Sequence, residues 1–203
     1  MKKVLLFGNS GHAKVVRSSA ESSGMEVIGY LDRTKIEETD LIYMGNELAI
    51  SFDTLRNHSF FVAIGSNEIR KKLHAFCDQN SVEICQVIDQ TAIIAKDVMI
   101  ERGTLVAPGS IINAGSRISE GVIINSGAII EHDCNVGAFS HVAPGAILLG
   151  GVTIGQECFI GAGAVLKEGI TLTSDVTIGA GTVVLHSIHE SGTWVGNPAK
   201  KIR

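Results

Sequence analysis

The clearest pattern in the chain is a six-residue spacing of aliphatic side chains in its second half. Starting at Ile88 and stepping by six residues, seventeen successive positions up to Val184 are Ile, Val or Leu. Four residues after each of the first sixteen positions comes Ala, Val, Thr, Ser, Cys or Ile. Such regularity is typical of a fold in which one short structural unit stacks repeatedly on itself.

A period of six residues fits neither an isolated helix nor a flat strand. It fits a prism in which each side is one short strand followed by a corner, so that three sides make a coil of roughly 18 residues and coils lie about 4.8 Å apart. The aliphatic residue of each side points inward, and the small residue fits beside it. Cys134 and Cys158 occupy the small inward position, so we expect both in the core. The unbroken register predicts a little over five coils with no long loop.

The first half of the chain alternates strand-like and helix-like patterns. The expected strands are Lys3–Phe7, Glu26–Leu31 and Phe60–Ile64, and the expected helices are His12–Ser23 and Glu68–Asp78. Ser66 or Asn67 is a candidate cap for the second helix. The order strand, glycine turn, helix, strand predicts a parallel α/β sheet.

Composition and charge exclude several classes of protein. Apolar residues make up 45% of the chain, which argues against disorder, and a net charge of −4 without a basic cluster argues against nucleic acid as the main partner. The apolar run VLLF near the N-terminus fits a buried strand better than a signal peptide. No run approaches the roughly 18–20 apolar residues of a membrane span. The four cysteines lack metal-type spacing, so we expect reduced thiols in a cytoplasmic protein.

Four stretches carry a family resemblance over essentially the whole chain. They are GNSGHAKVV at 8–16, FFVAIGSNEIRKKL at 60–73, INSGAIIEHDCNVGAFSHVAPGA at 124–146 and WVGNPAKKIR at 194–203. Together with the repeat, they resemble the hexapeptide-repeat acyltransferases and, more narrowly, the NeuD family of sugar acyltransferases. The PglD-type members of that family acetylate the 4-amino group of a UDP-linked trideoxy sugar with acetyl-CoA.

The resemblance implies a fold, a domain organisation and an oligomeric state. It implies a Rossmann-like nucleotide-sugar-binding α/β domain over residues 1–85. It further implies a left-handed parallel β-helix acyltransferase domain over 86–186 and a C-terminal tail over 187–203. Proteins of this kind are usually trimers, so a homotrimer with active sites between its subunits is expected.

Two histidines nine residues apart, His132 and His141, are the first candidates for catalysis. Nine residues are half a coil, so within one chain the two rings should lie on different sides of the prism and can share a site only with a second subunit. The spacing alone is equally compatible with two exposed side chains without a function. The resemblance implies that His132 is the general base and that His141 lies near the acetyl donor. It also implies that Asp133 orients His132, although Glu131 adjoins the histidine as closely in the sequence.

Gly150 follows His132 by one coil of the repeat, so both residues should occupy the same corner. A glycine there lets a ligand approach the backbone, whose N–H group could bind the thioester oxygen as charge develops on it. The resemblance places a glycine that contacts acetyl-CoA at this position. A corner glycine that serves only the turn is equally compatible with the sequence.

The candidate substrate site lies mostly in the first half of the chain. A glycine turn at 8–11 feeds a helix whose free N–H groups could bind a phosphate, but the complete G-x-G-x-x-G of a dinucleotide site is missing. The resemblance implies contacts from the nucleotide sugar to Gly11, His12, Asp32, Gly65, Ser66, Asn67 and Asn125. Arg33 stands where the family has a second acid near the uridine. The sequence offers no context for the remaining histidines, which we expect at the surface: His58, His74, His186 and His189.

The expected function is an acetyl-CoA-dependent N-acetyltransferase of glycan synthesis that acts on a UDP-linked amino-deoxy sugar. His132 would take the proton of the attacking amine in a direct transfer. One alternative is a sugar O-acetyltransferase of the sialic acid type. A γ-carbonic-anhydrase-like zinc enzyme would need three histidine ligands, whereas the repeat contains two, so no metal is expected. A non-enzymatic protein that only binds a sugar nucleotide is the remaining alternative.

Overall fold

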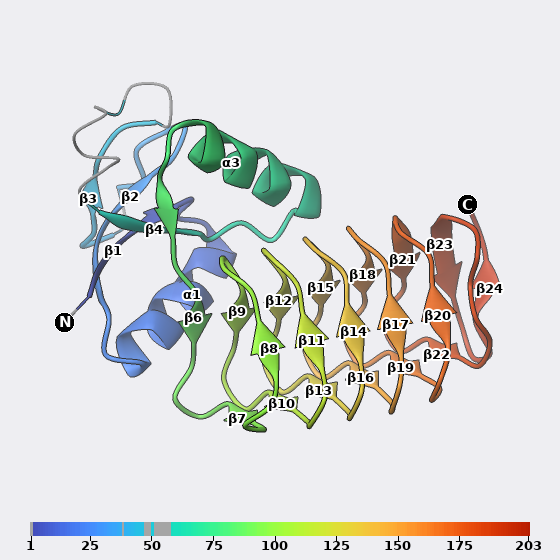
Figure 1. Ribbon diagram of the computed structural model, residues 1–203. Coiled ribbons are helices and arrows are strands. Elements are labelled where there is room, and N and C mark those ends of the chain that lie inside the picture. The colour runs from blue at the N-terminus through green and yellow to red at the C-terminus, as the bar shows by residue number, and fades with distance from the viewer. Residues whose placement is uncertain (1, 38, 47–49, 51–57) are drawn as a thin grey trace.

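The computed structural model describes residues 2–37, 39–46, 50 and 58–203, which form an α/β domain followed by a long β-helix (Figure 1). The α/β domain sits on the first coils of the β-helix, and the C-terminus lies at the far end of the prism. The expected combination of a Rossmann-like domain and a left-handed parallel β-helix is therefore confirmed.

The N-terminal domain is built on one parallel sheet with the strand order β3-β2-β1-β4-β5. Its elements are β1 (Lys3–Phe7), α1 (Gly11–Ser22), β2 (Glu26–Leu31), β3 (Ile42–Tyr43), β4 (Ser59–Val62), α3 (Asn67–Gln79) and β5 (Glu83–Ile84). The expected strands and helices agree with these bounds within one or two residues. Because β1 lies between β2 and β4, the strand order reverses direction at β1. Open α/β sheets bind their ligands at the carboxyl ends of the strands where the order reverses.

Helices α1 and α3 cover opposite faces of this sheet. Leu5 packs with Phe60 on the side of α3, whereas Leu6 packs with Phe61 on the side of α1, as the two-residue period of a strand requires. The cluster on the α1 side also includes Leu105 of the β-helix. The first helix therefore lies between its own sheet and the prism, and it joins the two domains through a shared apolar core.

The β-helix contains seventeen short strands, each of which ends on a residue of the aliphatic ladder. They are β6 (Val87–Ile88), β7 (Ile93–Ile94), β8 (Met99–Ile100), β9 (Leu105–Val106), β10 (Ile111–Ile112), β11 (Arg117–Ile118), β12 (Ile123–Ile124), β13 (Ile129–Ile130), β14 (Asn135–Val136), β15 (His141–Val142), β16 (Ile147–Leu148), β17 (Thr153–Ile154), β18 (Phe159–Ile160), β19 (Val165–Leu166), β20 (Thr171–Leu172), β21 (Val176–Ile178) and β22 (Val183–Val184). Ladder residues one coil apart are paired in parallel register, as Ile112 and Ile130 are. Cys134 and Cys158 are fully buried among them, as expected.

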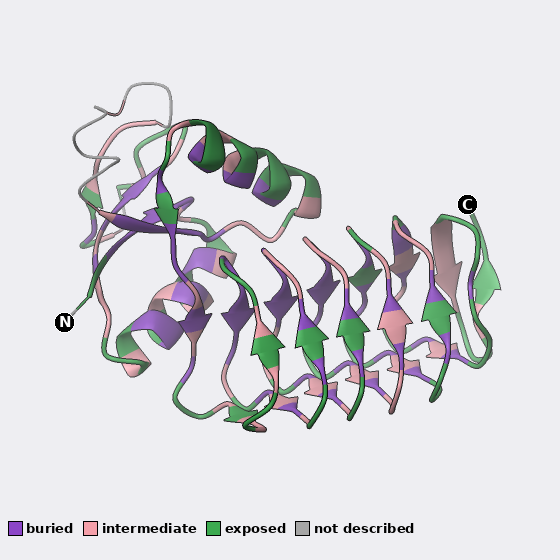
Figure 2. Cartoon of the chain, viewed as in Figure 1, coloured by how far each residue is buried: buried purple, intermediate pink, exposed green. Residues whose placement is uncertain are grey.

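The three faces of the prism differ in the residues that point outward. The docking face (β6, β9, β12, β15, β18 and β21) carries the N-terminal domain, which buries Val87, Leu105 and Ile123 (Figure 2). The aliphatic face (β7, β10, β13, β16, β19 and β22) presents only Ile and Val. The polar face (β8, β11, β14, β17 and β20) presents Met, Arg, Asn and Thr.

The last part of the chain continues the docking face beyond the aliphatic ladder. Strand β23 (Gly192–Val195) pairs in parallel with β21, and β24 (Lys200–Lys201) pairs antiparallel with β23. Residues 187–203, which the sequence marks as a tail, therefore include two strands of this sheet. Among the helices of the described ranges, none has the length and apolar character needed to cross a bilayer.

Candidate active site

His132 lies at the corner between the aliphatic and polar faces, directly after β13, and its side chain is 64% exposed. Its Nδ1 is 2.9 Å from Oδ2 of Asp133. A carboxylate only accepts hydrogen bonds, so Nδ1 carries the proton and Nε2 keeps its lone pair in the neutral ring. Asp133 adopts the left-handed conformation with φ 60°, which turns its carboxylate back toward the ring. Of the two acids that adjoin the histidine, Asp133 is thus the one that contacts it.

Gly150 lies directly against the His132 ring. A Cβ atom built on this glycine would stand 2.5 Å from Nε2 and 2.6 Å from Cε1 of the histidine, far inside van der Waals contact. The structure thus brings together His132, Asp133 and Gly150 at one corner. An imidazole nitrogen with a free lone pair and an accessible backbone edge is suited to proton transfer beside a developing oxyanion.

We expect Gly150→Ala to lower kcat by about tenfold, because the new methyl group must push the His132 ring aside. The backbone of Gly150 is not left-handed, so alanine should leave the thermal midpoint nearly unchanged. Steady-state rates should be compared with those of His132→Ala and of the double variant. If the glycine acts through the histidine, the double variant loses no more activity than His132→Ala alone, whereas additive losses would contradict this.

His141 belongs to a second group, at the boundary between the N-terminal domain and the docking face. It is 7% exposed, and its ring centroid lies 6.0 Å from that of His12 on α1 and 5.1 Å from that of Phe159 on β18. Nε2 of His141 is 3.0 Å from Nδ2 of Asn125. The structure therefore brings together His12, Asn125 and His141 from three elements.

The tautomer of His141 follows from its amide neighbour. Oδ1 of Asn125 accepts a hydrogen bond from the N–H of Ser126 at 2.8 Å, so Nδ2 is the atom that faces His141. This amide nitrogen can only donate, which makes Nε2 of the imidazole an acceptor and puts the ring proton on Nδ1. Within the described part of the chain, neither this Nδ1 nor Nε2 of His12 has a hydrogen-bond partner, although both are buried.

Burial keeps both of these histidines uncharged. Desolvation, followed by the positive charge of Arg70, lowers the pKa of His12 to about 4. Desolvation also lowers the pKa of His141 to about 4, with smaller lowering contributions from Arg70 and His12 and an opposing one from the backbone of Gly65. Two neutral imidazoles with unpartnered nitrogens can donate to or accept from a ligand that reaches them.

The structure does not bring His132 and His141 together within one chain. His132 stands at the corner that precedes the polar face, and His141 opens β15 of the docking face. The two groups therefore occupy different corners of the prism.

A cleft of about 280 Å³ opens at the carboxyl ends of β1, β2 and β4. It is lined by Phe7, Gly8, Ser10, Leu31, Asp32, Arg33, Ile64, Ile69 and Leu73. Gly8 has φ 93°, and a Cβ there would lie 2.8 Å from Cγ1 of Ile64, so only glycine allows the loops after β1 and β4 to meet so closely. The walls are largely apolar, and two charged residues, Asp32 and Arg33, also line the cleft.

Two features at this cleft could bind a polar ligand. Helix α1 begins at Gly11, and the preceding Ser10 makes no side-chain capping bond, which leaves N–H groups of the first turn open to an anion. The carboxylate of Asp32 accepts the N–H of Asn9 at 3.1 Å and the N–H of Arg33 at 2.7 Å, and it retains further acceptor capacity.

The loop after β4 is mostly engaged within the chain. Ser66 caps α3 by accepting the N–H of Ile69 at 3.4 Å. The amide of Asn67 donates to the carbonyl oxygens of Glu157 and Cys158, at 3.1 Å in each case. Gly65 lies beside His12. Of these three, only Gly65 therefore adjoins the histidine pair, whereas Ser66 caps α3 and Asn67 joins the helix to the prism.

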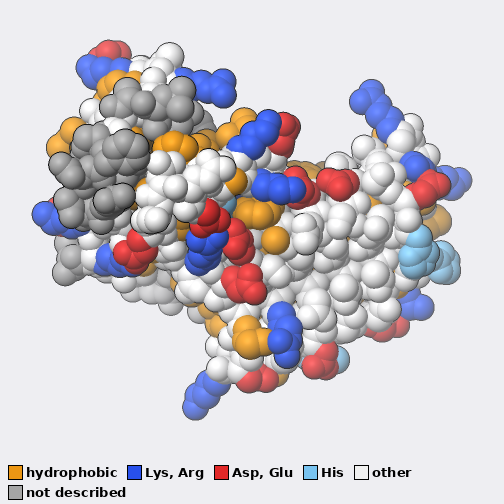
Figure 3. Space-filling view, turned by 45° about the horizontal axis from the view of Figure 1, so that its top comes forward, with side chains coloured by type: hydrophobic (Ala, Val, Ile, Leu, Met, Phe, Trp, Pro, Cys, Tyr) orange, Lys and Arg blue, Asp and Glu red, His pale blue; other side chains and the backbone are white. Residues whose placement is uncertain are grey.

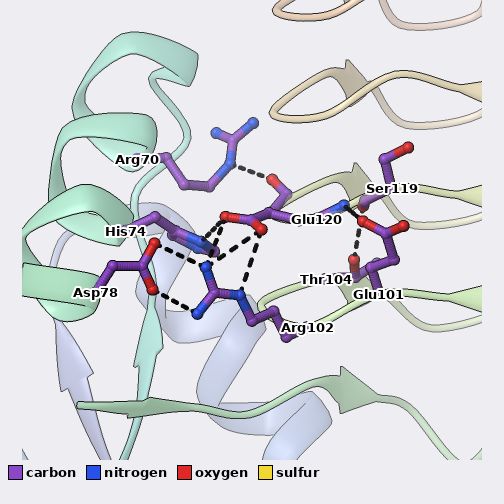
Figure 4. Close-up of polar contacts among 9 residues, drawn as sticks. Arg70, His74, Asp78, Glu101, Arg102, Thr104, Ser119 and Glu120 are labelled. Carbon is purple, nitrogen blue, oxygen red and sulfur yellow. Dashed lines mark hydrogen bonds and ion pairs between the residues drawn. The ribbon is translucent and has the colours of Figure 1, made fainter. Parts of the chain in front are cut away.

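The expectation that His74 lies at the surface is wrong, because its side chain is 1% exposed beneath α3. Its Nδ1 is 3.2 Å from Glu120, which also pairs with Arg102, and Arg102 in turn binds Asp78 of α3 through both carboxylate oxygens (Figure 4). The space-filling view shows acidic and basic side chains side by side along this junction (Figure 3). His186 and His189 are exposed, as expected, and His58 is partly buried.

Sequence reasoning also missed Arg70, which is fully buried on the same side of α3 as His74. The four-residue spacing of the two was the available signal, but two polar residues gave no reason to assign that side to the interior. Over the described ranges, no cluster of three or more His, Cys, Asp or Glu side chains is arranged to hold a metal ion.

Comparison with known proteins gives two family matches and several similar structures. Residues 3–77 match the model of the PglD N-terminal domain, and residues 151–186 match the hexapeptide repeat of succinyl-transferase. The acetyltransferase domain of PglB from Neisseria gonorrhoeae FA1090 is 33% identical over 100% of both chains, with a TM-score of 0.92. It is also known in complex with acetyl coenzyme A.

Two further structures extend this comparison. Perosamine N-acetyltransferase from Caulobacter crescentus is 34% identical over 100% of this chain and 98% of that chain, with a TM-score of 0.94. Its structure, in which a histidine is replaced by asparagine, contains CoA and GDP-perosamine. WeeI from Acinetobacter baumannii AYE is 23% identical over 100% of both chains, and its TM-score of 0.83 shows the same fold.

Proposed function

This chain belongs to the NeuD/PglD-type sugar acetyltransferases, and from that premise we propose that it acetylates the amino group of a UDP-linked amino-deoxy sugar. It is an acetyl-CoA-dependent acyltransferase, and its relatives are sugar N-acetyltransferases that bind acetyl-CoA or CoA. The proposal extends this to a UDP-linked acceptor and to its 4-amino group. The observation that supports it most is the cleft at the strand ends, which combines apolar walls, an open helix N-terminus and Asp32.

In the proposed reaction the amine nitrogen attacks the thioester carbon of acetyl-CoA without an enzyme-bound intermediate. Nε2 of His132 takes the proton that the nitrogen loses, the C–S bond breaks, and CoA leaves as the thiol after it receives that proton. Asp133 stabilises the imidazolium through Nδ1. The N–H of Gly150 and the Nδ1–H of His141 are the proposed donors to the thioester oxygen and the acetyl-CoA arm.

The two domains divide the ligands in this proposal. Residues 1–85 hold the nucleotide sugar, with Gly11 at the diphosphate and Asp32 at the uridine. His12, Gly65 and Asn125 approach the sugar. Residues 86–186 hold acetyl-CoA, and of the proposed sugar contacts they supply Asn125 alone. We place the reaction in the cytoplasm, where both substrates are made.

We further propose a homotrimer whose subunits meet along the aliphatic face. Six outward side chains form an in-register column there: Ile93, Ile111, Ile129, Ile147, Val165 and Val183. None of them is buried within the described chain, and an uncovered apolar column of this length is typical of an interface between subunits. His132 stands at the edge of this face, so a neighbouring copy would bring its own His141 group toward it.

A thiol-release assay over a panel of nucleotide sugars tests the function. Acetyl-CoA should be consumed with UDP-linked 4-amino sugars, and the matching hydroxyl sugars should give no thiol. Turnover of GDP-linked amino sugars instead would show that the substrate carries GDP and not UDP. This outcome is worth testing because GDP-perosamine is bound by the Caulobacter relative. Turnover of a hydroxyl acceptor alone would favour the O-acetyltransferase, and no thiol with any acceptor would contradict the proposal.

We expect Asp32→Ala to weaken binding of the nucleotide sugar by about ten- to a hundredfold, because a hydrogen bond to a charged group contributes about 1.5–3 kcal/mol. Affinity for acetyl-CoA should stay unchanged, since the two ligands are assigned to different domains. Calorimetric titration with each ligand separately measures both effects, and Lys35→Ala, an exposed change nearby, serves as the control. Equal losses for the two ligands would count against the division between the domains.

A further inference from the structure

Arg70 is a fully buried cation at the junction of the two domains. All three of its nitrogen atoms donate hydrogen bonds, at distances between 2.6 and 3.3 Å. The acceptors are the carbonyl oxygens of Ile64, Gly65, Gly121, Phe139 and Ser140 and the side-chain oxygen of Asn67. Because a buried charge is tolerated only when its donors are satisfied, this set of acceptors is a built site for a guanidinium.

No carboxylate of the described chain forms an ion pair with Arg70. The acid whose charge acts on it is Glu157, which pairs instead with Lys71. Burial lowers the pKa of Arg70 to about 10, so the guanidinium still carries its charge at neutral pH. Its positive field therefore reaches the surrounding groups without a counter-ion beside it.

Two of the residues that accept hydrogen bonds from Arg70 lie next to the two buried histidines, His12 and His141. Ser140 immediately precedes His141 in the chain, and its carbonyl accepts a bond from Arg70 at 3.3 Å. On the opposite side, Gly65 accepts a bond at 3.1 Å and lies next to the His12 ring. A single side chain thus holds the loop after β4 and the turn before β15 at a fixed separation.

We propose that Arg70 is a positioning residue of the acyl-transfer site, which ties the loop after β4 to the turn before β15 and thereby fixes His12 opposite His141. The proposal rests on the proposed function for its catalytic meaning, but its geometry is a property of the free protein. Arg70 itself is closed off from both ligands, so it acts only through the residues that it holds.

The charge of Arg70 has a second consequence for His141. If this ring were protonated, its Nε2–H would face the N–H of the Asn125 amide, and that amide is fixed by Ser126. Two donors would then confront each other, so the site works only with neutral His141. The ionisable groups that act on this ring are Arg70 from α3 and His12 from α1, and both disfavour its protonation. Phe159 and Asn125, which also contact it, are uncharged.

The experiment compares Arg70→Met, which removes charge and donors, with Arg70→Lys, which keeps the charge but cannot reproduce the planar set of five N–H donors. Lys72→Met is the matched control, because Lys72 is exposed on the same helix and, among the described residues, pairs with Glu68 alone. Histidine resonances of the free protein are titrated by NMR, and kcat and KM are measured over pH 5–9. The thermal midpoint of each variant reports whether it folds.

In Arg70→Met the pKa values of His12 and His141 should rise by about one unit, because a nearby like charge is lost. Its kcat should fall by about tenfold or more over the whole of pH 5–9. The KM for the nucleotide sugar should change by less than about threefold. Arg70→Lys should keep the low pKa values and still lose kcat.

The proposal would be overturned if Arg70→Met folds and its histidine pKa values and kcat match those of Lys72→Met. If Arg70→Met does not fold, full kcat in Arg70→Lys would overturn it equally, because lysine lacks the fixed donor geometry. The NMR titration needs no substrate. A rise in the histidine pKa values without any transferase activity would therefore support the arrangement while the proposed function failed.

Discussion

Replacement of His132 by alanine is expected to lower kcat by about 10²–10⁴-fold, the usual contribution of a positioned acid–base group. The Michaelis constants for both substrates should change little, because the base acts mainly in the transition state. The ring is 64% exposed at a corner outside the aliphatic ladder, so the thermal midpoint should barely move. Steady-state kinetics over pH 6–9 with a melting curve for each variant measure these effects.

His141→Ala serves as the comparison for this result. If His141 contacts the donor, its loss should raise the KM for acetyl-CoA while kcat falls less than in His132→Ala. The kcat of Asp133→Asn should lie between those of the wild type and of His132→Ala, since the His132 ring keeps a neighbour but loses the stabilising charge. A His132→Ala enzyme that retains more than about half of the wild-type kcat over the whole pH range would exclude this histidine as the base. Glu131, Asp133 or bulk water would then be the better candidate.

The β-helix could be read from the sequence because its physical requirement recurs at every coil. Each strand needs one aliphatic residue pointing inward and one small residue beside it. A wrong assignment at one strand is therefore revealed by the spacing of the strands that follow. The same repeat predicted that Gly150 would stand over His132, and the two are in contact. The N-terminal strands could also be predicted from the sequence. Leu5 and Leu6 face two separate apolar layers, so the strand is a continuous apolar run.

The junction between the domains could not be read in the same way. The apolar residues Ile69 and Leu73 of α3 line the open cleft, whereas the side of the helix that is buried against the prism carries Arg70 and His74. Leu73 and Phe76 pack against the sheet, so the hydrophobic pattern identifies the side of α3 that faces the sheet but not the side that faces the prism. Burial of Arg70 and His74 depends on carbonyl and carboxylate partners 46 to 70 positions further along the chain, a distance over which the sequence carries no periodic signal. The contact of Asp133 with His132 similarly depends on one left-handed residue that spacing cannot reveal.

The second large effect is expected from Ile129→Arg, in the middle of the aliphatic face. This side chain points away from the core of the prism, so arginine should leave each subunit folded, but it would place three charges in the proposed interface. The protein should sediment as a monomer and lose about 100-fold or more of its activity. Thr153→Arg, a change of similar exposure on the polar face, is the matched control and should remain an active trimer. A fully active monomer would contradict both the trimer and the shared site.

Subunit mixing shows which chains build each site. Subunits of His132→Ala and subunits of His141→Ala are unfolded together, refolded as mixed trimers and assayed at an acetyl-CoA concentration at which His141→Ala alone has little activity. If one site takes His132 from one chain and His141 from its neighbour, random mixing of equal amounts restores about a quarter of the sites, because each restored site needs one particular order of two adjacent subunits. If both histidines of a site came from the same chain, every site would lack one of them and mixing would restore nothing. The half-coil separation of the two rings, at different corners of one prism, is the reason to expect recovery.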